Sequence, residues 1–230
     1  MNKEARLIDK IMTIVFIVVL VLFILSCSIF MPLMNRGFYY AQIDDLNIVE
    51  TLNNYTREDY TKDDVIEAFD DVMDFIWKGS EFKTGKLKFS ESGKSHFEDC
   101  VPLFWLDFIV FIITSILMIT FLILNITKTV VIQDIKGMSA LFYGGIITIG
   151  VVIILGIFGI ISFDLLFEYF HKVFFPGKDN WVFNPRDDEV ILILPEEFFM
   201  RCAILIGATL FVLSGSAIAY GVIKKKGKLV

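Results

Sequence analysis

Long apolar stretches divide the chain into alternating hydrophobic and polar blocks. Asp, Glu, Lys and Arg are absent from residues 11–35, 108–127, 137–163 and 202–223. Each stretch reaches the roughly 20 residues that a helix needs to cross the hydrocarbon core of a bilayer. Lipid offers no partners for backbone N–H and C=O groups, so each stretch is expected to be helical. The pattern predicts transmembrane helices at about 7–31, 102–126, 138–163 and 197–223.

Two polar segments, 32–101 and 164–196, lie between these runs and are expected to form an extracytoplasmic cap. In the first segment Thr61 is a good N-cap, an apolar stripe follows it, and Gly79 is placed to end the helix. Residues 86–89 alternate between lysine and apolar side chains, which is compatible with a short strand. The expected fold is an all-α polytopic membrane protein with four transmembrane helices and a small, mostly helical cap, as one integral membrane domain over residues 1–230.

The distribution of charge predicts the orientation. Both ends and the loop at 128–136 share one side of the membrane, which holds nine of the 21 basic residues but three of the 27 acidic ones. The positive-inside rule makes that side cytoplasmic and the cap external. A cleaved signal peptide is the alternative for the first run, but this run stays apolar beyond Cys27, which favours a membrane anchor.

The composition agrees with a membrane protein and shows no pattern typical of a metal site. The chain is 56% hydrophobic, above the roughly 45–50% of ordinary soluble domains, as the apolar runs require. Its three cysteines, Cys27, Cys100 and Cys202, show neither the spacing of a metal site nor that of a disulfide framework. We expect no metal.

The two histidines are the candidate catalytic groups. His96 precedes the second apolar run and His171 follows the third, so both fall on the predicted external side. Imidazoles titrate near neutral pH and serve as general acids and bases. The alternative is that each histidine packs at the membrane interface. Asp99 either orients His96 or is a helix N-terminal charge, and Asp188 has the same ambiguity, with a capping or loop role favoured.

Aromatic residues are dense around the second histidine. In most membrane proteins such a group forms an interfacial belt. The functional alternative is a dry pocket for acyl chains, with a few polar groups aimed at one reactive centre. The candidate pocket residues are Tyr39, Phe170, Phe174, Phe175, Asn180, Trp181, Phe183 and Arg201.

These motifs resemble those of the lipoprotein intramolecular transacylase (Lit) family. The resemblance rests on residues 170–175 (FHKVFF), 180–185 (NWVFNP), Asp188 and 191–195, and on the SHFED motif at 95–99, in which Asp99 follows His96 by three residues. It extends to the layout of four membrane helices with one histidine in each external segment. Residues 38–89 match the family only loosely.

The resemblance implies a function. Such enzymes act in the bacterial cell membrane on lipoproteins whose N-terminal cysteine carries a diacylglyceryl thioether. They move the sn-2 acyl chain to the α-amino group of that cysteine, which gives a lyso-form lipoprotein. The family histidines correspond to His96 and His171. The implied partners are diacylglyceryl lipoproteins and membrane lipids, with no nucleic acid.

Physical chemistry agrees with that reaction. Conversion of an ester into an amide is downhill, so no cofactor is expected. The amine must lose a proton and the glycerol oxygen must gain one, and two imidazoles with ordinary pKa values near 6.5 suit both transfers. The main alternative is a non-catalytic sensor or accessory protein with a ligand-binding cap. A small transporter is less favoured, because the helices lack mid-membrane charges.

Overall fold

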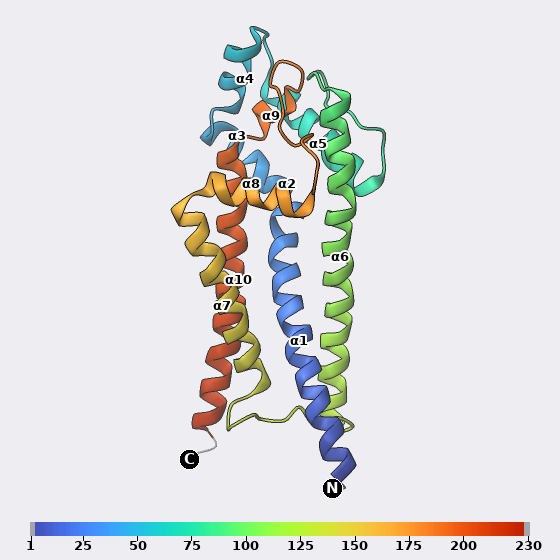
Figure 1. Ribbon diagram of the computed structural model, residues 1–230, viewed down its shortest axis with the longest axis vertical. Coiled ribbons are helices and arrows are strands. Elements are labelled where there is room, and N and C mark those ends of the chain that lie inside the picture. Colours follow the sequence, from blue (N-terminus) through green and yellow to red (C-terminus); the bar gives the residue numbers. More distant parts are fainter. Residues whose placement is uncertain (1–2, 228–230) are drawn as a thin grey trace. The chain divides into compact units, whose positions relative to one another are not determined.

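The computed structural model describes residues 3–227, and every regular element within that range is a helix (Figure 1). The all-helical prediction is confirmed. In chain order the helices are α1 (Lys3–Met34), α2 (Arg36–Tyr40), α3 (Gln42–Asp45), α4 (Ile48–Thr56), α5 (Lys62–Lys78), α6 (Glu91–Ile126), α7 (Ala140–Ile161), α8 (Phe163–Phe174), α9 (Val190–Ile193) and α10 (Glu196–Lys226).

Three described helices are long and apolar enough to cross a membrane: Arg6–Met34 of α1, α6 and α10. The described apolar stretch of α7, Ala140–Ile154, is shorter. The fourth crossing therefore stays a prediction. The α6 helix begins at Glu91, well before the predicted boundary at residue 102, and contains Pro102 within it.

The chain forms two compact units. The long-helix unit comprises Met1–Met31, Asp107–Ile160 and Leu205–Val230. Its buried apolar side chains come from α1, α6, α7 and α10 and centre on one face of α1. This core contains Phe16, Ile17, Val19, Leu20, Ile24, Phe121, Ala140, Leu210.

Two glycines of α7 permit close helix packing within this unit. A Cβ atom on Gly144 would lie 2.5 Å from Leu20 of α1, and one on Gly145 would lie 2.7 Å from the Ser214 carbonyl of α10. Small residues at such positions let helix backbones approach, as in many membrane bundles. Gly150 has no neighbour within 4 Å of its Cβ position, so the glycines of α7 are not equivalent.

The short-helix unit comprises Pro32–Leu106 and Ile161–Ile204. The helix α5 lies wholly inside this unit. It begins at a capping box between Thr61 and Asp64 and ends at Gly79, whose φ of 66° suits glycine. Both predicted ends of this helix are confirmed. Its apolar stripe is buried in a core with residues of α2, α3, α4 and α9.

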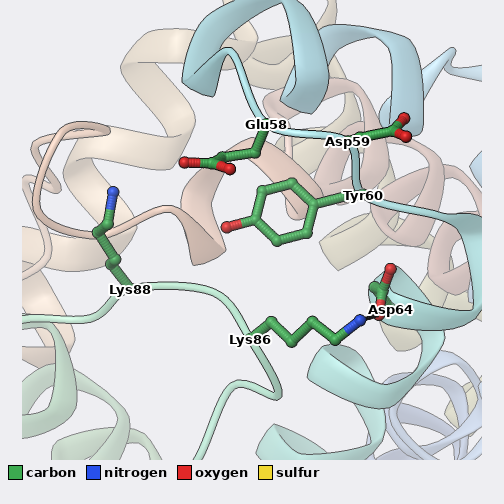
Figure 2. Close-up of a pocket in the computed structure, with 6 residues that line it drawn as sticks. All are labelled: Glu58, Asp59, Tyr60, Asp64, Lys86 and Lys88. Atoms are coloured by element: carbon green, nitrogen blue, oxygen red, sulfur yellow. Dashed lines mark ion pairs between the residues drawn. The ribbon is translucent and has the colours of Figure 1, made fainter.

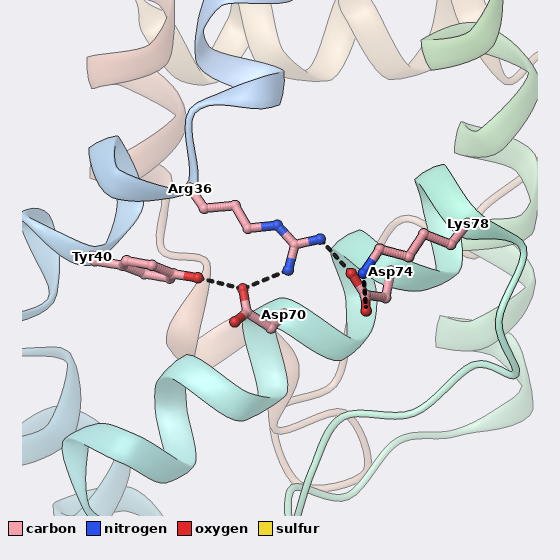
Figure 3. A network of polar contacts seen from close by, with 5 residues as sticks. All are labelled: Arg36, Tyr40, Asp70, Asp74 and Lys78. Carbon is pink, nitrogen blue, oxygen red and sulfur yellow. Dashed lines mark hydrogen bonds and ion pairs between the residues drawn. The ribbon is translucent and has the colours of Figure 1, made fainter.

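A polar network ties α2 to α5 in this unit (Figure 3). Arg36 donates to Asp70 at 2.8 Å and also to Asp74, and Tyr40 donates its hydroxyl to Asp70 at 2.5 Å. Lys78 completes the network with a 2.8 Å bond to Asp74. These charges are partly exposed, so the network contributes geometry more than free energy.

The prediction of a short strand at residues 86–89 is wrong, because the structure describes these residues and they form no strand. The N–H of Lys88 donates to the Glu189 carboxylate at 2.9 Å, and the Lys88 carbonyl accepts from the Glu189 N–H at 2.9 Å. A single residue therefore satisfies the backbone groups that would otherwise pair with a neighbouring strand.

Candidate active site

The two histidines lie side by side in the short-helix unit. His96 comes from the first turns of α6 and His171 from the last turn of α8. Their ring centroids are 5.6 Å apart, with an angle of 37° between the ring planes. Only 6% of His96 and 7% of His171 is exposed. The fold thus places two buried imidazoles within reach of one small substrate group.

The start of α6 sets the position of His96. Ser90 lies just before the helix, and its hydroxyl accepts a hydrogen bond from the Gly93 N–H at 3.0 Å. The buried carboxylate of Asp188 accepts from the Ser90 N–H at 2.7 Å and from the Ser90 hydroxyl at 2.9 Å. Asp188 therefore holds the residue that caps the helix start, which is a supporting role of the kind favoured from sequence, where a capping or loop role was expected. Helix-start N–H groups otherwise lack intrahelical partners.

The hydrogen bond that His171 makes defines its tautomer. Its Nδ1 lies 2.7 Å from the carbonyl oxygen of Phe167, one turn earlier in α8. A carbonyl only accepts, so Nδ1 carries the proton and Nε2 of the neutral ring is an acceptor. Burial lowers the pKa of His171 below its ordinary value of 6.5, against a smaller opposing effect of the Phe167 bond. The ring is neutral at pH 7, with a free lone pair.

His96 has a different environment. Its Nε2 lies 3.5 Å from the thiol sulfur of Cys100, one turn later in α6. Its Nδ1 is buried and has no hydrogen-bond partner among residues 3–227. A buried polar atom without a partner is costly and needs an explanation, of which a catalytic role is one.

Asp99 makes its bonds to the loop before α9 rather than to His96. Its carboxylate forms an ion pair with Lys178 and accepts from Asn180 Nδ2 at 2.9 Å. The adjacent Trp181 stacks on the His171 ring, with centroids 4.7 Å apart. Of the two roles considered for Asp99, the orienting bond to His96 is therefore not made in this structure. Asp99 instead holds the segment that carries Trp181.

Aromatic rings enclose the imidazole pair. Phe175 is buried, and its ring centroid lies 5.0 Å from that of His96 and 5.8 Å from that of His171. The ring centroid of Phe183 lies 5.5 Å from that of His96. Phe170 is 5.3 Å from His171 and 4.7 Å from Phe174. Phe170 and Phe174 are 46% and 50% exposed, respectively. The site therefore has a buried aromatic wall and an exposed aromatic edge.

Two predicted pocket residues have their described contacts elsewhere in the unit. Tyr39 is fully buried, stacks on Phe69 at 3.8 Å and donates its hydroxyl to the Ile193 carbonyl at 2.7 Å. Arg201 pairs with Asp45 at 3.3 Å. Tyr39 is thus a core residue, and Arg201 has a carboxylate partner of its own.

Sequence reasoning missed the roles of Phe167 and Cys100. Each lies four residues from a histidine on the same helix, a spacing that places side chains or carbonyls on one face. That spacing was the available signal, but many residues share it without making such a contact.

A separate pocket of about 370 Å³ lies around Tyr60 and is lined by neither histidine (Figure 2). Both lysines that line it are paired within the unit: Lys86 with Asp64 at 2.7 Å, and Lys88 with Glu189 at 3.2 Å. Within residues 3–227, no group of three His, Cys, Asp or Glu side chains is placed to hold a metal ion.

Comparison with known proteins gives consistent results. The family model described as lipoprotein intramolecular transacylase Lit matches residues 14–199. A solved structure of the membrane-integral Lit of Bacillus cereus is 27% identical, with a TM-score of 0.82 over 96% of this chain and 98% of that chain. A comparison with curated proteins found no match.

Two structures of variants of the same Bacillus cereus protein also match. In one a histidine is replaced by arginine (27% identity, TM-score 0.75, 96% of this chain and 94% of that chain), and in the other by alanine (28%, 0.74, 95% of each chain). The family match covers most of the chain, and the structural likeness covers nearly all of it. The chain therefore belongs to the lipoprotein intramolecular transacylase (Lit) family of membrane acyltransferases.

Proposed function

We propose that this protein moves the sn-2 acyl chain of a diacylglyceryl lipoprotein to the α-amino group of the lipoprotein's N-terminal cysteine. The product is a lyso-form lipoprotein. The observation that carries the proposal is the pair of buried imidazoles, His96 and His171, 5.6 Å apart in a chain of this family.

The imidazoles act as a proton-transfer pair. The attacking nitrogen forms a C–N bond to the sn-2 carbonyl carbon, and the bond from that carbon to the glycerol oxygen breaks. Starting from the neutral amine, the nitrogen loses one proton and the glycerol oxygen gains one, so protons are neither consumed nor released overall. Nε2 of His171 is a free acceptor for the first transfer, and His96 lies beside it to pass a proton onward.

Confinement supplies much of the rate. Donor and acceptor belong to one molecule, so the enzyme needs to fold the lipid until nitrogen and carbonyl carbon reach attack distance. Such positioning can lower a barrier by about 7–11 kcal/mol. The wall formed by Phe175, Phe183 and Trp181 excludes water from the imidazoles, and the exposed rings of Phe170 and Phe174 offer apolar surface to an acyl chain.

The proposed topology follows the charge distribution. Four membrane crossings, with α7 as the third in chain order, leave both termini in the cytoplasm and the histidines at the extracytoplasmic face. This side is where a lipoprotein presents its lipidated N-terminus. Membrane lipids surround the outward-facing apolar side chains of α1, α6 and α10, many of which are exposed in the protein alone.

Co-expression with a diacylglyceryl lipoprotein, in a host that lacks N-acylation, tests the proposal. Acyl migration leaves the intact mass unchanged, so fragmentation by mass spectrometry must locate the chains. We expect one acyl chain on the cysteine nitrogen with the wild-type protein and none with His96→Ala or His171→Ala. Lys172→Ala is the matched control on α8, because its side chain is exposed and pairs with Glu168 on the helix surface. Wild-type samples with both chains still on the glycerol would contradict the proposal.

A further inference from the structure

The orientation of the Asn180 side-chain amide is determined by Asp99. Carboxylates only accept hydrogen bonds, so the Nδ2 end of the amide must face Asp99, at 2.9 Å. The opposite end is Oδ1, an acceptor. It is buried and has no hydrogen-bond partner among the described residues.

A second acceptor belongs to the neighbouring imidazole. The bond to Phe167 places the proton of His171 on Nδ1, which leaves Nε2 as a lone-pair acceptor. Among residues 3–227 no group donates a hydrogen bond to this nitrogen. Trp181, which follows Asn180 in the chain, stacks on the His171 ring. The loop that carries Asn180 is thereby held against the imidazole.

We propose that Asn180 Oδ1 and His171 Nε2 form a subsite for the α-ammonium group of the lipoprotein's N-terminal cysteine. This inference rests on the proposed function and names the residue that recognises the acyl acceptor. An ammonium group brings three N–H donors, and both acceptors lack a donor. Ester carbonyl and phosphate oxygens accept only, so they do not match a site made of acceptors.

The surrounding charges are consistent with this assignment. Asp99 holds the amide in place and is itself paired with Lys178, so the carboxylate and the lysine cation offset each other and leave little net charge beside the amide. The N–H that points at His171 Nε2 is the one that breaks when the nitrogen becomes a nucleophile. The proton passes to Nε2, where an N–H bond forms, and the nitrogen keeps the electron pair that attacks the carbonyl carbon. After the attack the nitrogen loses a second proton and the glycerol oxygen gains one, so one proton is released overall when the reaction starts from the ammonium form.

Binding of two lipopeptides tests the subsite without chemistry. Both carry ether-linked alkyl chains in place of esters, so no transfer occurs. One has a free α-amino group and the other is N-acetylated. At pH 7 we expect the wild-type protein, in detergent, to bind the free-amine peptide about tenfold tighter, as one hydrogen bond to a charged group supplies.

Two variants separate recognition from structure. Asn180→Leu removes the acceptor and should reduce the preference to about twofold or less. Lys178→Met removes the other bond to Asp99 and loosens the same loop, yet leaves the amide in place, so it should retain the preference.

The outcomes distinguish this inference from the proposed function. Equal affinity of the wild-type protein for both peptides would overturn the ammonium subsite, even if acyl transfer is observed. An Asn180→Leu variant that keeps the wild-type preference would overturn the role of Asn180, as would loss of preference in Lys178→Met. Because the measured quantity is a ratio, a general loss of folding lowers both affinities and does not mimic the predicted result.

Discussion

Asp188 is expected to stabilise the first turns of the helix that carries His96. Its carboxylate is 4% exposed and accepts two hydrogen bonds from Ser90, at 2.7 and 2.9 Å. A hydrogen bond to a charged group contributes about 1.5–3 kcal/mol. We expect Asp188→Ala to destabilise the start of α6 by about 3 kcal/mol, the low end of the range for two such bonds. The low end applies because both bonds go to one residue and water can enter the vacated space.

Hydrogen exchange measures this local opening. A loss of about 3 kcal/mol corresponds to roughly 100-fold faster exchange. The effect should be confined to the start of α6, in peptides that span residues 90–98. Acyl transfer should fall as well, because the loosened turns carry His96.

Glu91→Ala is the matched control. It also removes a carboxylate at the start of α6, but this side chain is 89% exposed and its Lys94 partner is 3.8 Å away. Exchange in residues 90–98 should therefore change little. If Asp188→Ala and Glu91→Ala gave the same exchange rates there, the anchoring role of Asp188 would be refuted.

Three further predictions concern separate parts of the chain. Tyr39→Phe should lower the free energy of unfolding by about 1 kcal/mol, since it leaves a buried carbonyl without a donor, and a changed KM would contradict its assignment to the core. Burial lowers the pKa of His171 in the folded protein, whereas its pKa in the unfolded chain is near 6.5, so the free energy of unfolding should hold above pH 6.5 and fall below it. Acyl transfer should likewise persist at pH 6.5 and fall in more acidic buffer. A rate already halved at pH 6.5 would argue against a pKa lowered by burial. Gly145→Ala should cost about 1–3 kcal/mol through overlap with the Ser214 carbonyl, while Gly150→Ala, which meets no neighbour, should not lower the midpoint of thermal unfolding.

The sequence by itself determined the features that depend on neighbouring residues. Helices with apolar faces follow from the spacing of hydrophobic side chains, and the ends of α5 follow from Thr61 and Gly79, because capping and positive φ are local properties. The family motifs around His96 and His171 are likewise contiguous in the chain.

Only the tertiary structure decided which distant groups meet. The partners of Asp99 lie in another segment, so its spacing from His96 suggested an orienting bond that Lys178 and Asn180 take instead. Tyr39 was a candidate pocket residue from sequence, but the packing of α5 and α9 places it in a core. Hydrogen-bond partners and burial arise from contacts between elements, and neither periodicity nor spacing contains that information.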